Sequence, residues 1–448
     1  MGRKNYYVGC MVLCLLLSIV IKPVILVSAE DIDNDIYYEI GYGDTIYNTQ
    51  DLFSIYEENS ITYQRNMMYY QIQELTGLIA DESYDSTNSQ YVDVLQKITE
   101  LNEAKEVLIN YRNMLIAEEA ALYDTVEEED LEKDVSDTDT TSIIAEIDAQ
   151  IASIDLQLLQ YKSNKGTLEM NLAEAKLQED IADFYSDYNL LITKEAKNKL
   201  NNEFLKSCYS LIIYKEQLDY YKSYQNYLSL VSEANNIKFG LGLITQLTLD
   251  TNISNKLKNS IATMENQNIY NAIFQSIKNN SSIPDNTRIR LNLVNNKKQY
   301  GEETVISKFI SNNTGYLQLE NYVRSYQNYI GSAGTRSYSS YRQTELRISD
   351  YKLQIDELKN NIRTYVAKAI KSYELAFQSM ETNQRELLVN DEICNTIKTK
   401  LEHGRASRIQ LQQAIYEKEA VEVKYYQSCY EVVVWQDILD NNIYDATP

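Results

Sequence analysis

The chain has 448 residues, and its 65 Asp and Glu outnumber its 42 Lys and Arg, for a formal net charge of −23. This balance argues against nucleic acid as a partner, because phosphate binding needs a concentrated basic surface. With 13 Gly and 3 Pro, the chain has too few turn residues for a β protein, so we predict an overwhelmingly helical fold.

Residues 1–29 are predicted to be a secretory signal peptide. Arg3 and Lys4 form a basic start, Val8–Ile21 is apolar, and Val27-Ser28-Ala29 offers a cleavage site of small residues. A retained anchor is the alternative, but the apolar stretch falls short of the ~20 residues that a spanning helix needs. Cleavage removes three basic and no acidic residues, which takes the net charge from −23 to −26. The mature chain is predicted to be exported, with no transmembrane helix of its own.

Three cysteines, Cys208, Cys394 and Cys429, remain after cleavage. Their number is odd and each lies in a helical pattern, so a disulfide framework is not implied. We predict that they are small buried hydrophobic residues.

The first helical pattern runs from Leu52 to about Leu78 and is followed by a predicted polar break over Asp81–Ser89. Two seams with coiled-coil spacing come next. The first consists of Val94, Ile98, Leu101, Leu108, Tyr111 and Leu115. The second consists of Ile144, Ile147, Ile151, Ile154, Leu158, Tyr161, Leu168, Leu172 and Ala175. We predict a coiled-coil hairpin over about residues 90–175, made of two antiparallel helices.

An acidic segment, Asp124–Ser142, joins these two seams. Asp134, Asp137 and Asp139 superficially resemble a calcium loop, but the central Gly and the closing Glu are missing. We therefore predict a solvated loop and no metal site.

A third helix is predicted from Ile144 to Phe239, which would span ~140 Å at ~1.5 Å per residue. A returning helix follows from Gln246 to about Lys278. Residues 279–335 are irregular, with short helices predicted and one strand permitted over Arg288–Val294.

The last two helices are predicted over Ser339–His403 and from Arg408 to about Asn442. They complete a second pair of long helices that follows the first pair along the chain.

The two long-helix pairs reverse direction at similar sequences 162 residues apart, Phe239-Gly-Leu-Gly242-Leu-Ile-Thr245 and Leu401-Glu-His-Gly404-Arg-Ala-Ser407. In each, a Gly can adopt the left-handed conformation that ends a helix, and a Thr or Ser three residues later can cap the next helix. Ser407 and Gln410 also have the spacing of a capping box. We predict two tight tips on duplicated α-hairpins.

These tips resemble those of the TolC family of outer-membrane efflux proteins. Gly242-Leu243-Ile244-Thr245 fits the family's tip pattern, whereas Gly404-Arg405-Ala406-Ser407 has Arg where the first tip has Leu. Leu52–Gln71 also looks like the opening helix of the family. The resemblance implies an all-α fold, with little or no β structure: a TolC-like α-barrel protomer of long antiparallel coiled-coil helices in two tandem α-hairpin repeats.

The resemblance also implies a division of the mature chain. Residues 30–280 would be the first repeat, with its tip at 239–245, and residues 281–448 the second, with its tip at 401–407. Two departures are visible. Ile79–Ile143 has the pattern of a coiled coil and an acidic loop where the family has barrel strands, so we predict a divergent member without the usual barrel. Gln410 and Gln413 stand where acidic gate residues are often found.

By the same resemblance, the protein would be a homotrimeric exit duct that conducts substrates passively in a tripartite efflux or secretion system. Its tips would dock to an adaptor of the periplasmic, membrane-fusion type, which an ABC- or RND-type pump holds. The docking residues would be Gly242, Leu243, Thr245, Gly404, Arg405 and Ser407. The expected location is the cell envelope: the outer membrane where one exists, otherwise the cell surface.

No catalytic constellation accompanies these features. His403 is the only histidine and precedes a helix-ending Gly, where it interacts with the helix dipole. The Gly240 and Gly242 pair lacks the strand of a phosphate-binding loop. We predict no enzyme and no cofactor. An exported coiled-coil scaffold or spacer of the envelope is the alternative function, and a coiled-coil regulator of envelope enzymes is a third without positive residue evidence.

Overall fold

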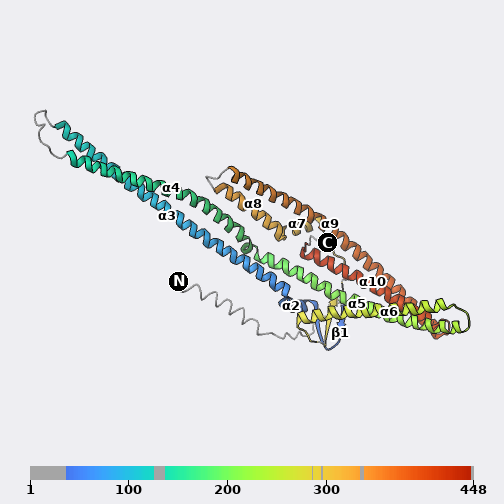
Figure 1. The fold of residues 1–448 in the computed structure, drawn as a ribbon. Coiled ribbons are helices and arrows are strands. Elements are labelled where there is room, and N and C mark those ends of the chain that lie inside the picture. Colours follow the sequence, from blue (N-terminus) through green and yellow to red (C-terminus); the bar gives the residue numbers. More distant parts are fainter. Residues whose placement is uncertain (1–36, 126–136, 285, 294–295, 333–337, 445–448) are drawn as a thin grey trace.

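The computed structural model describes residues 37–125, 137–284, 286–293, 296–332 and 338–444 (Figure 1). The predicted signal peptide and the centre of the acidic segment lie outside these ranges.

Helices make up most of the described chain, so the predicted all-α class is confirmed. In chain order they are α2 Thr49–Asn59, α3 Ile61–Thr125, α4 Asp137–Asp187, α5 Asn189–Gly240, α6 Gln246–Ser281, α7 Glu302–Ser311, α8 Thr314–Ser332, α9 Tyr338–Glu402 and α10 Arg408–Asn441. Within the described ranges, no helix is both long enough and apolar enough to cross a membrane.

A small sheet joins the start of the described chain to the segment that follows α6. Its strands are β1 Tyr37–Gly41, β2 Thr45–Asn48 and β3 Thr287–Asn292, with β3 in the centre, antiparallel to β1 and parallel to β2. The strand β3 overlaps Arg288–Val294, where the sequence permits a strand, whereas β1 and β2 were not predicted. Gly43 has φ +121° and lies so close to the Asn286 carbonyl that a Cβ would be 1.9 Å from its oxygen, so the turn between β1 and β2 requires Gly.

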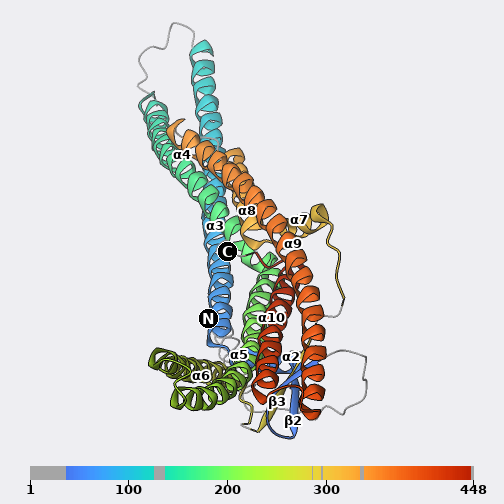
Figure 2. The ribbon, with the colours of Figure 1, turned by 90° about the vertical axis from the view of Figure 1, so that its right-hand side faces the viewer.

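The long helices form a single curved layer (Figures 1 and 2). Near the tips its order is α6, α5, α10, α9, and at the other end it is α3, α4, α8, α9. One edge of the layer is therefore α9, against whose middle α7 packs. The other edge is α6 near the tips and α3 farther away.

The main hydrophobic core lies where α5, α9 and α10 meet the sheet. Its fully buried side chains include Phe204, Ile289, Val366, Tyr373 and Val432. All three cysteines are free and buried, as predicted. Burial raises the pKa of the Cys429 thiol to about 11, which keeps it uncharged in the core.

Two predicted features of the first helices are wrong. Residues 81–89 form no break but lie inside α3, because α4 supports this segment: Tyr84 lies under the Lys176 ammonium and the Tyr91 hydroxyl donates to Glu169 Oε1 at 3.0 Å. The interruption comes earlier, at Ser60, whose hydroxyl accepts from the Tyr63 backbone N–H at 3.3 Å. This Ser starts a new helix where the first had been expected to continue.

The single helix predicted over Ile144–Phe239 is also wrong, since it divides at Tyr188 into α4 and α5. Asp187-Tyr188-Asn189 is a run of weak helix formers. The Tyr188 ring packs against Phe184, with centroids 4.9 Å apart, and its carbonyl accepts from the N–H groups of Leu191 and Ile192. The backbone thus leaves the helix for one residue and immediately resumes it.

The helices α3 and α4 are antiparallel. Tyr91 contacts Glu169, Lys105 pairs with Asp155 and Arg112 pairs with Asp148. The residue numbers rise along α3 by the same steps by which they fall along α4. Figure 1 shows this pair reaching well beyond the other helices, at the end opposite the tips.

Candidate docking surface at the hairpin tips

The first tip closes α5 with a left-handed glycine. Gly242 has φ +72°, and the N–H groups of Gly242 and Leu243 donate to the carbonyls of Phe239 at 2.9 Å and Lys238 at 2.8 Å. These two bonds form a Schellman motif. The Thr245 hydroxyl then accepts from the Thr248 N–H at 3.3 Å and caps α6.

The second tip repeats these bonds 162 residues later. Gly404 has φ +67°, and the N–H groups of Gly404 and Arg405 donate to Leu401 at 2.9 Å and Lys400 at 2.7 Å. The predicted capping box is present, with the Gln410 N–H donating to the Ser407 hydroxyl at 3.2 Å and the Ser407 N–H donating to Gln410 Oε1 at 2.8 Å. The turn chemistry predicted for both tips is confirmed.

Loss of this cap gives a first prediction. Ser407→Ala should lower the free energy of unfolding by about 1 kcal/mol, since the first turn of α10 would lose a partner for the Gln410 N–H. Chemical denaturation followed by circular dichroism measures the change. Ser407→Thr keeps the acceptor oxygen and should be nearly neutral, and equal losses in the two variants would contradict the capping role.

The tips present apolar side chains to solvent. Leu241 and Leu243 flank Gly242 and are both 69% exposed, and Gly404 and Arg405 are exposed at the second tip. A Cβ built on either Gly would meet nothing within 4 Å, so the backbone is open to a partner. Leu241 was not among the predicted docking residues, although the repeated Gly-Leu in the sequence is a signal for it.

Both tips lie at one end of the layer, with the first projecting farther (Figure 1). Gln412, eight residues past Gly404, donates to the carbonyl of Ser223, which precedes Gly242 by nineteen residues. The first tip therefore lies eleven residues farther from this contact than the second tip, which is about 16 Å along the helix axis. The structure thus brings Gly242, Leu243 and Thr245 together in one turn and Gly404, Arg405 and Ser407 in the other. Their docking role remains a prediction.

The only histidine, His403, lies at the second tip, and Gln410 and Gln413, which stand where the family often has acidic residues, lie just beyond it. The His403 side chain is exposed, directly after the end of α9. Gln413 Nε2 donates to Glu417 Oε1 at 2.9 Å along α10, and Gln410 is used by the cap. No group of three metal-binding side chains occurs within the described ranges.

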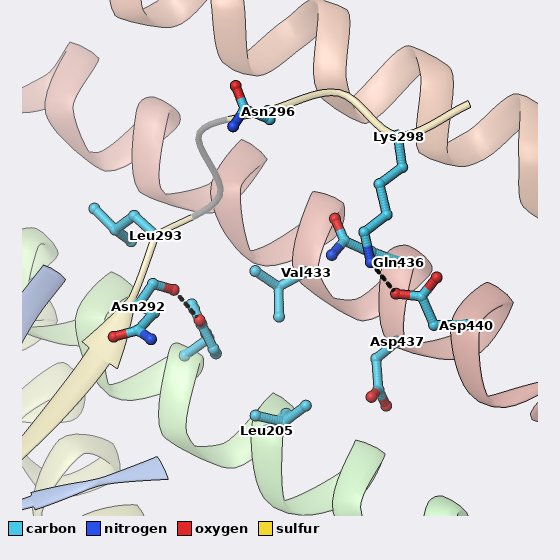
Figure 3. Close-up of a pocket in the computed structure, with 10 residues that line it drawn as sticks. Leu205, Asn292, Leu293, Asn296, Lys298, Val433, Gln436, Asp437 and Asp440 are labelled. Atoms are coloured by element: carbon cyan, nitrogen blue, oxygen red, sulfur yellow. Dashed lines mark hydrogen bonds and ion pairs between the residues drawn. The ribbon is translucent and has the colours of Figure 1, made fainter. Parts of the chain in front are cut away.

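A cleft of about 420 Å³ lies farther from the tips, between α5, α10 and the segment after β3 (Figure 3). Its acidic groups already have partners. Asp440 pairs with Lys298 at 2.6 Å, and Asp437 accepts from Asn202 at 2.8 Å. Burial raises the pKa of Asp437. These contacts hold α5, α10 and the segment after β3 together, so we interpret the residues of the cleft as structural.

Comparisons with known proteins give likenesses in fold. No family model and no curated protein matches this sequence. The solved structure of CusC aligns at a TM-score of 0.43 and 11% identity, over 61% of this chain and 91% of CusC. The outer membrane protein VceC of Vibrio cholerae gives 0.43 and 8%, over 62% of this chain and 75% of VceC. The Campylobacter jejuni CmeC outer membrane channel gives 0.40 and 11%, over 62% and 68%.

The likeness to outer-membrane channels of the TolC family therefore extends over about 60% of the chain. At these identities and TM-scores it concerns the fold alone, and the functional argument rests on the residues of this chain.

Proposed function

We propose that this chain is one subunit of a TolC-like exit duct, through which substrates pass without catalysis. The observation that carries the proposal is a layer of long helices with both hairpin tips at one end. A single layer encloses no lumen, but several copies joined edge to edge would. The TolC resemblance of the tips makes three the expected number, in the cell envelope of the producing organism.

In this proposal the tips dock to an adaptor protein, which in turn is held by an ABC- or RND-type pump. The exposed Leu241 and Leu243 side chains and the open glycine backbone suit the meshing of two hairpin ends. Substrate choice would belong to the pump, since the cleft described above has its charged groups already paired.

The duct is tested by light scattering of the purified chain followed by electron microscopy. We expect a trimer with a central lumen and all tips at one end. A monomer, or a rod without a lumen, would contradict the proposal.

Docking is tested separately by Gly242→Trp and Gly404→Trp. Each should reduce binding to the cognate adaptor at least tenfold, because a bulky side chain would obstruct the docking surface of the tip. Gly242→Ala and Gly404→Ala are the matched controls: they impose the same positive φ on a residue with Cβ, without the bulk. Gly166→Trp, at an open position on α4, adds the same bulk far from the tips. Unchanged adaptor binding by the Trp tip variants, with helicity intact, would count against docking through the tips.

The scaffold or spacer function has one observation in its favour. The far part of the α3 and α4 pair extends beyond the other helices, as a spacer arm would (Figure 1). A stable oligomer without a lumen in the same electron microscopy experiment would favour this second candidate.

A further inference from the structure

One face of α4 keeps a regular pattern from the far end of the helix to the body of the molecule. Its positions alternate in steps of four and three residues, which places them on one side of the helix. From the far end they are Ala145, Ala149, Ala152, Leu156, Leu159, Ser163, Gly166, Met170, Ala173 and Leu177. We call this the outer face of α4. None of its residues is charged, although acidic and basic residues are frequent elsewhere on the helix.

Near the body, α8 covers the outer face. Leu177 is 6% exposed and shares a buried cluster with Tyr326 of α8. Three residues further along the same face, the Asp180 carbonyl accepts from Asn321 Nδ2 of α8 at 3.0 Å. The residue numbers rise along α8 as they fall along α4, so the two helices are antiparallel. This part of the outer face is therefore a helix–helix contact within the chain.

The cover ends where α8 and α9 end. Ser332, the last residue of α8, is eleven residues past Asn321, which places it at about the height of residue 169 of α4. Tyr338 begins α9 ten residues before Ile348, which clusters with Leu177, so α9 begins at a similar height. From there the outer face continues for about 23 residues, or about 35 Å, to Ala145. Figure 1 shows α3 and α4 extending past α8 and α9.

On this outer stretch the apolar side chains face solvent. Leu156, Leu159 and Met170 are 66%, 69% and 46% exposed. The small residues Ala145, Ala149, Ala152 and Ser163 between and beyond them are exposed as well. The opposite side of the helix is the one that packs on α3, where Ile147 and Leu158 are 5% and 4% exposed. Small residues beside Leu form the holes into which large side chains of a second helix insert.

The charge around the outer face selects the kind of helix that can cover it. Residues 91–125 and 137–170 of the two helices contain 13 acidic and 5 basic residues, for a formal net charge of −8. Four of the five cations pair with carboxylates of the same two helices, as Arg112 does with Asp148 and Lys105 with Asp155. Glu146 and Glu174 are exposed along one border of the outer face. A second copy of these acidic helices would be repelled, whereas a helix with basic borders is attracted.

We propose that the exposed stretch of the outer face binds an amphipathic helix of a second protein. Its contact stripe would carry large apolar side chains, with Lys or Arg along the borders, and it would lie on α4 in line with α8. The helix α8 has the same kind of side chain in its contact with α4, since Tyr322, Tyr326 and Ile330 pack around Leu177. The site is independent of the proposed duct and lies at the end of the molecule opposite the hairpin tips.

A synthetic helix is the probe for this site. It has four heptads, Leu at both apolar positions of each heptad and Lys at the bordering positions, and its binding to the full chain is followed by fluorescence anisotropy. A second peptide with Glu in place of Lys is the matched control and should bind about tenfold more weakly or worse, because its borders meet the acidic helices. Failure of the Lys peptide to bind, or equal binding of the two peptides, overturns the proposal.

Three variants of the full chain locate the contact. Leu156→Glu should weaken binding of the Lys peptide about tenfold or more, since a carboxylate would replace an apolar contact. Val107→Glu is the matched control: Val107 is 67% exposed on α3, so the same charge is added and a similar apolar surface is lost away from the outer face. Its binding should stay close to that of the parent chain. Equal weakening by both Glu variants would mean that the peptide responds to charge alone, and overturns the site.

Ala152→Leu separates a fitted contact from general stickiness. The substitution adds apolar surface and keeps a strong helix former, but it fills a hole that a side chain of the partner needs. Binding should weaken about tenfold with helicity unchanged. Tighter binding by Ala152→Leu would overturn the proposal, because it would show that apolar area alone attracts the peptide.

Sedimentation distinguishes a second protein from a second copy. Without peptide, Leu156→Glu should leave the sedimenting species of the chain unchanged, since the outer face is not used between copies. A shift to a smaller species would identify another copy as the occupant and overturn the proposal. The duct stands or falls separately, because its test is the lumen seen by electron microscopy and none of these measurements depends on that lumen.

Discussion

Replacing Phe204 with Ala is expected to lower the free energy of unfolding by about 3–5 kcal/mol, as large-to-small changes in packed cores do. The Phe204 side chain is 0% exposed. Its ring lies 4.8 Å from that of Tyr56 and 5.6 Å from that of Phe53, measured between centroids. The ring therefore joins α2 to α5 beside the sheet, and its loss would leave a cavity that these long, rigid helices cannot collapse to fill.

Urea unfolding followed by circular dichroism, at a fixed protein concentration, measures this loss. Leu159→Ala is the matched control, because Leu159 lies on α4 and is 69% exposed. It should change the free energy of unfolding by no more than about 0.5 kcal/mol. A loss below about 1 kcal/mol in Phe204→Ala would mean that the core beside the sheet does not hold the fold together.

The tips could be predicted from sequence because their chemistry is local. The bonds that close them span three to five residues, from Gly242 to Phe239 and from Leu243 to Lys238. A Gly that tolerates positive φ and a capping Thr or Ser three residues later are sufficient to specify such a turn. The same reasoning identified both copies, and the structure has both.

The sheet and the helix breaks could not be predicted in this way. The strand β1 pairs with β3 across about 250 residues of sequence, with Ile40 opposite Ile289, and neither partner identifies the other by local pattern. Likewise, a polar stretch inside α3 stays helical because α4 lies against it, whereas Tyr188 interrupts the next helix within an apolar pattern. Tertiary contacts decide the strand pairing and the continuity of α3, whereas the break at Tyr188 coincides with the weak helix formers Asp187-Tyr188-Asn189.

The direction in which a helix faces is a further limit. The spacing of apolar residues along α6 predicts a helix, and the usual assumption is that such a face turns inward. In the structure Asn259 and Asn266 face α5 while Leu257 and Met264 face solvent. The periodicity identifies the two faces of a helix, and only the fold shows which of them packs against the rest of the chain.

Glu216 is expected to make the protein less stable as pH rises from about 4.5 to about 7. It is 9% exposed, between α5, β1 and α10, and accepts a hydrogen bond from the Tyr38 hydroxyl. Burial raises the pKa of Glu216 from 4.5 to about 7, and the nearby Glu422 carboxylate adds to the rise, while the Tyr38 bond opposes it. Burial raises the pKa of Glu422 as well.

Between these two pKa values the folded state holds a proton that the unfolded state has released, so the free energy of unfolding falls with rising pH, by up to about 3 kcal/mol. Below pH 4.5 both states are protonated, and above pH 7 both are charged. Glu216→Gln keeps an acceptor for Tyr38 but cannot ionise. It should therefore be about 1–3 kcal/mol more stable than the parent chain in urea unfolding at pH 8, and nearly equal to it at pH 4.5. Glu233→Gln, at an exposed position of the same helix, should leave the parent pH dependence in place. If Glu216→Gln lost stability with rising pH as steeply as the parent chain, ionisation of Glu216 would not be the cause of that loss.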